Sequence, residues 1–258
     1  MLLLIPEVTP KIAASIYPLE LVLGCVIAWI LGEDRLELQR RTYYLLESKN
    51  IINGIFAYKG NLVWTVDFVC LALVQIYVKC RNHALLPRDA RTNSSGPLKS
   101  LLKQYTSKII LKNVLLAITF FIIDSIFVLT GGSCLNGDVT RSAERCRISG
   151  GQWQGGFDIS GHFCFLVNIS MILWLELSQF RSYMERESVV FPVSKVVNGV
   201  LVVSSGVLGI WVLMLMVTAV YYHTVLEKVL GCALGYVCVL VMYWLIPRSR
   251  RFNGLLYS

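Results

Sequence analysis

Two histidines in this sequence are surrounded by residues that fit acid–base or nucleophilic chemistry. The first closes the stretch Gly155-Gly156-Phe157-Asp158-Ile159-Ser160-Gly161-His162. Glycines permit close backbone approach and expose amide donors suited to an anion. Asp158 or Ser160 can cap the following helix, and a histidine at that helix start can donate a proton to a leaving oxygen. The alternative interpretation is a flexible loop with a helix cap and an interfacial histidine.

The second histidine, His223, precedes an acidic residue by four positions, Glu227. If this segment is helical, the two side chains share a face, and Glu227 can accept a hydrogen bond from the imidazole. That contact would fix the tautomer and raise the basicity of the free nitrogen, which suits a nucleophile or a base. The alternative interpretation is a plain interhelix salt bridge.

The elements that must position these histidines are membrane helices. The chain has 258 residues, of which 55% are hydrophobic and 16% charged, and its mean hydropathy is +0.62. These values exclude a disordered chain, a coiled coil and an ordinary cytosolic enzyme. Apolar segments near the 20 residues that cross a bilayer predict an all-α polytopic protein with one helical domain over residues 1–258. The six predicted spans are approximately Ile12–Leu31, Leu62–Val78, Ile109–Thr130, His162–Phe180, Val196–Tyr222 and Val225–Ile246.

Lys and Arg set the expected orientation, and they explain the net charge of +8 better than nucleic-acid binding does. With both termini cytosolic, the cytosolic side holds Lys11, a loop from Lys79 to Lys108, Lys112, Arg181, Arg186, Lys195, Arg248, Arg250 and Arg251. The opposite side holds Arg35, Arg40, Arg41, Lys49, Lys59, Arg141, Arg145 and Arg147. The excess of basic residues on the first side favours cytosolic termini.

With this topology, ionisable residues from five spans gather at the lumenal side. They are Asp67, Asp124, His162, His223, Glu227 and Lys228, whereas Glu176 lies toward the cytosolic end. Charged residues inside spans are costly, so such a layer indicates a site in a cavity. The alternative is helix-end side chains that reach interfacial water.

Two cysteines, Cys134 and Cys146, fall in the third loop and are predicted to face the lumen. An oxidising lumen favours a disulfide bond between them, which would brace the loop that leads to His162. The alternative is two free thiols. Three histidines without metal-ligand spacing give no case for zinc, and we expect neither a metal nor another cofactor.

The elements Gly156-Phe157-Asp158-Ile159-Ser160-Gly161-His162, Tyr222-His223 and Glu227-Lys228-Val229-Leu230-Gly231 resemble the FIT family, the fat-storage-inducing transmembrane proteins. Lys49-Asn50 through Asn53, Phe56, Lys59, Trp64 and Thr65 also resemble the family's segment before the second span. The resemblance covers most of the chain. It implies six spans in the endoplasmic reticulum membrane, cytosolic termini, a lumenal site and a role in lipid droplet formation and lipid homeostasis.

The resemblance further implies a lipid-phosphatase-like hydrolase that cleaves fatty acyl-CoA into acyl 4′-phosphopantetheine and adenosine 3′,5′-bisphosphate. In lipid phosphatases the histidine of Ser-Gly-His acts as acid, and a later histidine, supported by an acidic residue, attacks phosphorus. His162 and His223 would take these roles, with support from Glu227, Asp158 and Ser160.

The phosphate-binding elements of lipid phosphatases, a Lys…Arg-Pro element and a Ser-Arg pair, are missing from this sequence. Phosphate must then be held by other groups, for which Lys59, Lys228 and the amides of Gly155 to Gly161 are the candidates.

Two other functions stay open. One is a non-enzymatic protein that binds di- or triacylglycerol and promotes droplet formation, and the other is a transporter. The matched histidines favour the enzyme, and no inverted repeat supports the transporter. Expected partners are fatty acyl-CoA, neutral lipids and membrane lipid, without nucleic acid; the sequence leaves protein partners, oligomeric state and acyl-chain preference undetermined.

Overall fold

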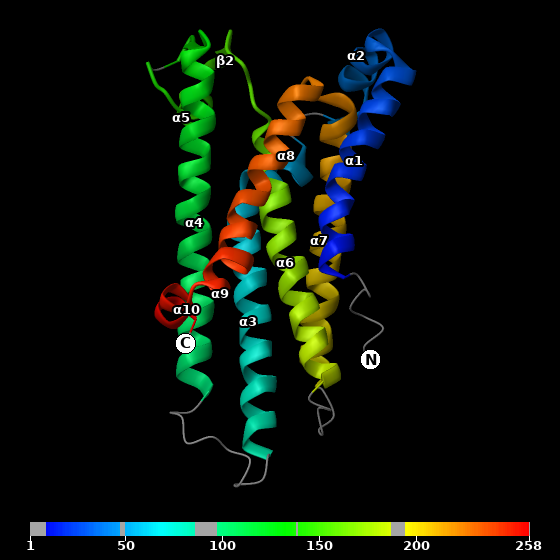
Figure 1. Cartoon of the computed structure of the whole chain (residues 1–258). Coiled ribbons are helices and arrows are strands. Elements are labelled where there is room, and N and C mark those ends of the chain that lie inside the picture. The colour runs from blue at the N-terminus through cyan, green and yellow to red at the C-terminus, as the bar shows by residue number, and fades with distance from the viewer. Residues whose placement is uncertain (1–8, 47–49, 86–96, 138, 187–193, 258) are drawn as a thin grey trace.

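The computed structural model describes residues 9–46, 50–85, 97–137, 139–186 and 194–257. Across these residues the chain forms a bundle of long helices with one small two-stranded sheet (Figure 1). The long elements are α1 (Pro10–Leu31), α3 (Gly60–Leu85), α4 (Pro97–Leu129), α6 (Gly161–Arg186), α7 (Lys195–Tyr221) and α8 (Val225–Leu240).

Shorter elements complete the described chain. They are α2 (Glu33–Thr42), a 3₁₀ turn η2 (Tyr44–Leu46), a π-helix η3 (Asn53–Tyr58), strand β1 (Ser133–Leu135), α5 (Ala143–Ile148), strand β2 (Gln152–Gln154), a π-turn η5 (Val241–Leu245), α9 (Ile246–Arg248) and α10 (Arg250–Leu256).

Six described helices are long and apolar enough to cross a bilayer, which confirms the predicted all-α polytopic class. Their spans are Pro10–Leu31, Gly60–Leu85, Leu98–Leu129, Gly161–Arg186, Lys195–Tyr221 and Val225–Arg248. Each contains the core of one predicted segment. The sixth continues from α8 through η5 into α9.

The predicted loop from Lys79 to Lys108 is wrong at both ends. Lys79 lies within α3, and α4 begins at Pro97, so Lys99, Lys103 and Lys108 are helical. Hydropathy marks only the apolar part of a helix, and polar helical turns beyond it escape detection. The remaining loop residues, 86–96, lie outside the described residues, and so does Lys49.

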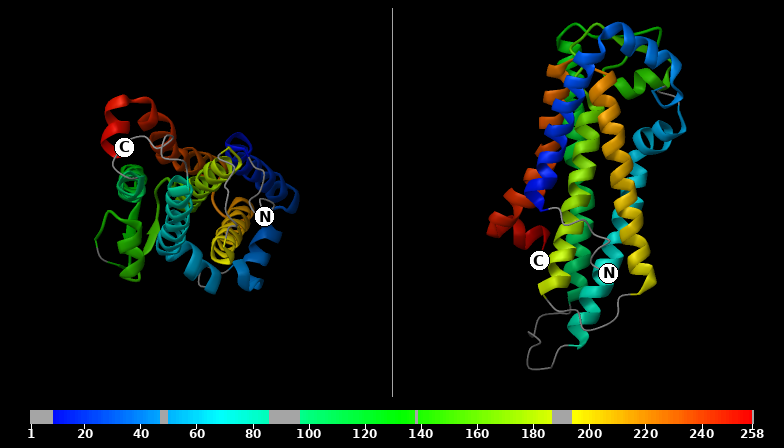
Figure 2. Two further views of the ribbon diagram at one scale, coloured as in Figure 1. Left: turned by 90° about the horizontal axis from the view of Figure 1, so that it is seen from below. Right: turned by 90° about the vertical axis from the view of Figure 1, so that its right-hand side faces the viewer.

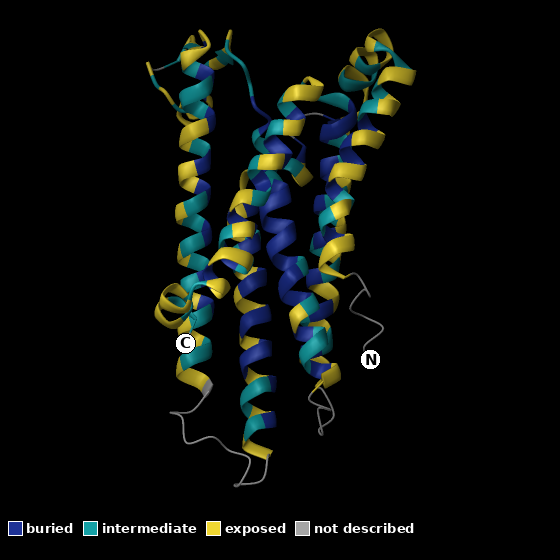
Figure 3. Cartoon of the chain, viewed as in Figure 1, coloured by how far each residue is buried: buried dark blue, intermediate teal, exposed yellow. Residues whose placement is uncertain are grey.

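Helix α6 forms the centre of the bundle. It is buried along most of its length (Figure 3) and packs most extensively against α8. Two glycines of α8 permit this close approach: a Cβ added to Gly231 would lie 2.4 Å from the Ser160 carbonyl oxygen, and one added to Gly235 would lie 2.8 Å from the Val167 Cβ. The tight contact sets the beginning of α6 against the beginning of α8.

Apolar side chains cover much of the outer surface. Seen along the bundle, α1 and α4 lie toward opposite edges (Figure 2), and only 22% of the apolar span of each is buried. Trp29 on α1 and Leu129 on α4 are each 84% exposed. Such apolar faces are unfavourable in water and favourable against lipid, which agrees with a membrane-spanning bundle.

A structured loop joins α4 to α6 at the end of the bundle where α6 and α8 begin, which we call the histidine end. Within it β1 and β2 pair antiparallel, with Cys134 opposite Trp153. A disulfide bond joins Cys134 to Cys146, the pair expected from the sequence. Trp153 stacks on Phe127 of α4 at 4.3 Å between ring centroids. The loop is thus fastened to α4 before it enters α6.

Candidate active site

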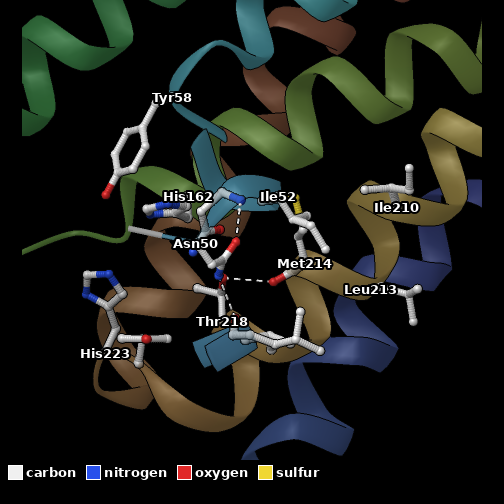
Figure 4. Close-up of a pocket in the computed structure, with 13 residues that line it drawn as sticks. Asn50, Ile52, Tyr58, His162, Ile210, Leu213, Met214, Thr218 and His223 are labelled. Carbon is white, nitrogen blue, oxygen red and sulfur yellow. Dashed lines mark hydrogen bonds between the residues drawn. The ribbon is translucent and has the colours of Figure 1, made fainter. Parts of the chain in front are cut away.

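A pocket of about 290 Å³ lies at the histidine end, between α7, Leu45 with residues of the range 50–58, the start of α6 and the turn that precedes α8. Figure 4 shows His162, His223 and Tyr58 around one end of this pocket, while Ile210 and Leu213 of α7 lie at the other. The pocket therefore has a polar end that carries both histidines and an apolar end that follows a membrane helix.

His162 occupies the first turn of α6. The Ser160 hydroxyl accepts a hydrogen bond from the Phe163 amide at 3.4 Å, so Ser160 caps this helix. The cap residue is buried, and its own amide donates to the Glu227 carbonyl at 3.2 Å. These bonds fix the start of α6 against α8 and hold His162 at the pocket.

His223 lies in the turn between α7 and α8, not in a helix. Its φ of 61° is left-handed, and α8 begins only at Val225 after the Thr224 N-cap. The prediction that His223 and Glu227 meet as helical neighbours is therefore wrong. They meet because Glu227 folds back in a capping box, in which its carboxylate accepts from the Thr224 amide at 2.7 Å. Non-glycine residues held in this conformation concentrate at functional sites.

Two carboxylates flank one nitrogen of His223. The Nδ1 atom lies 3.7 Å from Oε2 of Glu227 and 3.8 Å from Oδ2 of Asp158. These distances exceed a hydrogen bond, but catalytic contacts without substrate are often long. The carboxylates favour a proton on Nδ1, which leaves Nε2 with a lone pair for chemistry.

The Asp158 carboxyl responds to its neighbours. Partial burial raises its pKa, and Glu227 adds to this rise, while His223 opposes it. Asp158 thus keeps its proton to a higher pH than an ordinary aspartate, chiefly because burial disfavours its charged form and also because Glu227 carries a like charge.

The loop before His162 has fewer free amides than its glycines suggest. The Phe157 amide donates to Thr130 Oγ1 at 2.8 Å, and the Asp158 amide donates to Glu227 Oε1 at 3.3 Å. Together with the Ser160 bond, these contacts use three donors that we expected to face an anion. The loop is held in place by its amides, and its glycines serve close packing: a Cβ on Gly156 would lie 2.3 Å from the Phe127 carbonyl oxygen.

The two lysines expected to bind phosphate do not line the pocket. Lys228 is buried, and its Nζ donates to the Ala219 carbonyl at 2.6 Å near the end of α7. Lys59 follows η3 and is exposed. Gly161 is half-buried at the start of α6, where Phe120 lies against it. Both lysines thus lie outside the pocket lining, and their contact with phosphate stays a prediction.

The six ionisable groups predicted to form one lumenal layer do not all lie at the pocket: among them, its lining includes His162 and His223. Asp67 is buried and accepts a hydrogen bond from Ser204 at 2.8 Å, and neither it nor Asp124 lines the pocket. Asp67 lies seven residues after the start of α3, which corresponds to about 10 Å along the helix axis. Residues near the same side of the membrane therefore need not share one site. Among the described residues, no group of three or more His, Cys, Asp or Glu is arranged to hold a metal ion.

The sequence does not mark several of the pocket residues as functional. Asn50 is buried, donates to the Leu45 carbonyl at 2.8 Å and accepts from the Asn53 amide at 2.7 Å, which shapes the wall before η3. Tyr58 faces the histidines from η3 (Figure 4). The resemblance included Asn50 and Asn53 but assigned them no role, and no local pattern marks Tyr58, because its position depends on long-range packing.

Comparison with known proteins identifies relatives along most of the chain. The family model of the fat storage-inducing transmembrane protein, FIT, matches residues 41–243. Acyl-coenzyme A diphosphatase YFT2 of Saccharomyces cerevisiae is 42% identical, over 95% of this chain and 96% of the relative.

More distant relatives carry the same enzyme name. Acyl-coenzyme A diphosphatase fit1 of Schizosaccharomyces pombe is 30% identical, over 95% of this chain and 88% of its own length. Human acyl-coenzyme A diphosphatase FITM2 is 29% identical, over 74% of this chain and 68% of its own length. No solved structure matches the chain significantly.

Proposed function

Because the chain belongs to the fat storage-inducing transmembrane family, we propose that it is a membrane hydrolase that cleaves the diphosphate of fatty acyl-CoA. The products are acyl 4′-phosphopantetheine and adenosine 3′,5′-bisphosphate. The observation that carries the assignment is the pair of histidines on one pocket, with Nδ1 of His223 between two carboxylates. A lipid-binding protein requires the apolar part of this pocket but not the histidine pair.

His223 is the nucleophile in this proposal. Its Nε2 attacks one phosphorus of the diphosphate and forms a P–N bond, while the bridging P–O bond breaks. Glu227 and Asp158 hold the proton on Nδ1 and stabilise the positive charge that develops on the ring. Water then cleaves the P–N bond and regenerates the histidine. The enzyme supplies an oriented attacker for an anhydride whose own charge repels nucleophiles.

His162 is the general acid. It donates a proton to the departing phosphate oxygen and later takes one from the attacking water. Its place in the first turn of α6 puts the positive end of the helix dipole beside the developing negative charge. Ser160 acts on His162 by fixing this helix start, and so it is a positioning residue.

The apolar end of the pocket receives the acyl chain. Met214 and Leu213 of α7 line this end, and Leu213 is 68% exposed on a membrane helix. An exposed leucine there faces lipid, so the pocket opens toward the bilayer. An acyl-CoA whose tail lies in the membrane can reach the site from the side with its diphosphate at the histidines.

We place the protein in the endoplasmic reticulum membrane with cytosolic termini and a lumenal site, in support of lipid droplet formation. The excess of basic residues at the other end of the bundle and the disulfide bond at the histidine end support this orientation. A glycosylation acceptor engineered at Asn136 should be modified. One near Ser95, outside the described residues, should remain unmodified, and the reverse pattern would overturn the orientation.

The direct test of function uses purified protein in lipid nanodiscs with oleoyl-CoA. Mass spectrometry should find acyl 4′-phosphopantetheine and adenosine 3′,5′-bisphosphate in equal amounts. Release of free CoA and oleate would indicate a thioesterase instead. Binding of diacylglycerol without any cleavage of acyl-CoA would favour the non-enzymatic alternative.

A further inference from the structure

The charge of the site does not match its proposed substrate. An acyl-CoA carries a diphosphate and a 3′-phosphate, yet the charged groups nearest His223 are the carboxylates of Asp158 and Glu227. Like charges repel, and the side chain of Lys228 is bound to the Ala219 carbonyl. Lys228 therefore does not supply the phosphate-binding cation, and another basic residue near the pocket is needed.

Arg147 is placed to provide this cation. It belongs to α5 in the loop between α4 and α6, and its guanidinium carbon lies 4.2 Å from the ring centroid of Tyr58. Tyr58 in turn lines the pocket together with His162 and His223 (Figure 4). The right-hand view of Figure 2 shows the short helix α5 beside the segment that leads into α3. Arg147 thus contacts the polar end of the pocket through the ring of Tyr58.

The guanidinium is positioned but not neutralised. Cation–π stacking on Tyr58 restricts its orientation. No carboxylate in the described part of the chain lies within 4.0 Å of its nitrogens, and the residue is exposed. Its neighbour Cys146 is buried in the disulfide bond to Cys134, which fixes α5 in the loop. A planar guanidinium with free donors is the group best suited to bind phosphate oxygens in pairs.

We propose that Arg147, stacked on Tyr58, binds a phosphate group of the nucleotide half of the substrate at the mouth of the pocket. This inference rests on the proposed function. With the acyl chain along α7 and the diphosphate at the histidines, the nucleotide half extends outward, where α5 lies beside Tyr58. Both the diphosphate and the 3′-phosphate offer the same oxyanion chemistry, and the experiment separates them.

Arg147→Gln should lower kcat/KM for oleoyl-CoA about 10- to 100-fold, the effect of one lost charge-assisted phosphate contact. Arg147→Lys should recover only part of this loss, because an ammonium lacks the planar paired donors. Tyr58→Leu should resemble Arg147→Gln, whereas Tyr58→Phe keeps the ring and should retain most of the activity.

Arg145 supplies the matched control. It is also exposed on α5, two positions away, and therefore points to another side of the helix. Arg145→Gln removes the same charge from the same element and should leave kcat/KM within about twofold of the parent value. Equal losses in the two variants would show a general effect of loop charge and would overturn the proposal.

The two phosphate sources are separated with oleoyl-(3′-dephospho)-CoA. If the loss in Arg147→Gln vanishes with this substrate and appears mainly in KM, the arginine binds the 3′-phosphate. If the loss persists and includes kcat, it binds the diphosphate. Unchanged kinetics of Arg147→Gln with both substrates, in an active parent protein, overturn the inference. A parent protein that cleaves neither substrate would instead contradict the proposed function.

Discussion

At its beginning, α6 presents His162 to an open pocket; further along the same helix, Glu176 is buried among hydrogen-bond donors. The carboxylate of Glu176 accepts from Lys108, from Tyr243 at 2.5 Å and from Gln75 at 3.3 Å. The side chains of Lys108 and Glu176 are 3% and 1% exposed. We call this group of residues the Glu176 cluster.

The two regions differ in how their polar groups are satisfied. In the Glu176 cluster each partner is close and water is excluded, which is the arrangement that stabilises a buried charge. At the histidine end, the contacts of His223 are 3.7 and 3.8 Å, and the Asp158 side chain is 50% exposed. Charge inside a membrane bundle is therefore not by itself a sign of catalysis; unsatisfied polar groups on a pocket are the stronger indication.

Replacement of the histidines should remove activity and leave stability unchanged. His223→Ala should abolish cleavage of acyl-CoA, because no attacking atom remains. His162→Ala should lower kcat roughly 10²–10⁴-fold, the usual contribution of general acid catalysis. Both proteins should insert and keep the parent's thermal stability, since His162 lies at the start of a helix and His223 in a turn, outside the packed apolar interior. Steady-state kinetics and thermal unfolding in detergent measure these outcomes, and near-normal turnover by His223→Ala would refute the assignment.

Lys108→Ala should have the opposite effect: it should lower stability and leave activity unchanged. It leaves the buried Glu176 charge without its ion-pair partner, so we expect a loss of about 3–5 kcal/mol in the free energy of unfolding. The specific activity of the folded fraction should remain close to that of the parent. Lys99→Ala, on the same helix but exposed, is the control and should change stability by less than about 0.5 kcal/mol. A catalytic defect in folded Lys108→Ala would remove the distinction between the two regions.

Single changes of the carboxylates beside His223 should have the smallest effects. Asp158→Asn or Glu227→Gln should each reduce kcat about tenfold or less, because the other carboxylate still holds Nδ1. The double variant should lose roughly 10²–10³-fold, more than the product of the single losses, as expected for groups that share one role. A double-mutant cycle measures this coupling, and strictly multiplicative losses would argue against shared support of His223.

The sequence predicted the spans well because an apolar run of about twenty residues matches the length of a helix that crosses a bilayer. It also pointed to the disulfide pair and to Asp158 or Ser160 as the cap of α6, of which the structure shows Ser160. The sequence did not predict contacts between side chains that are far apart along the chain. Glu176 stands out in the sequence as an exception. Its partner Lys108 falls in the predicted loop, because Pro97 is compatible both with a loop and with the first position of a helix.

The same limit applies to the site. His223 and Glu227 were correctly paired for the wrong geometric reason, because spacing alone cannot show a left-handed residue between two helices. The contact of Tyr58 with Arg147 joins elements far apart in the sequence, and the bond of Lys228 to the Ala219 carbonyl depends on the turn between α7 and α8. Positions of chemical groups follow from packing, which residue types indicate only in part.

The central claim, that His223 attacks phosphorus, is tested most directly by trapping its adduct. Protein mixed with oleoyl-CoA is quenched in base within a turnover, because P–N bonds hydrolyse in acid, and its peptides are analysed by mass spectrometry. We expect a phosphorus-containing adduct on His223 that forms and decays at the rate of turnover and is absent from His223→Ala. Full turnover without any adduct on His223, or with an adduct on another residue, would contradict it.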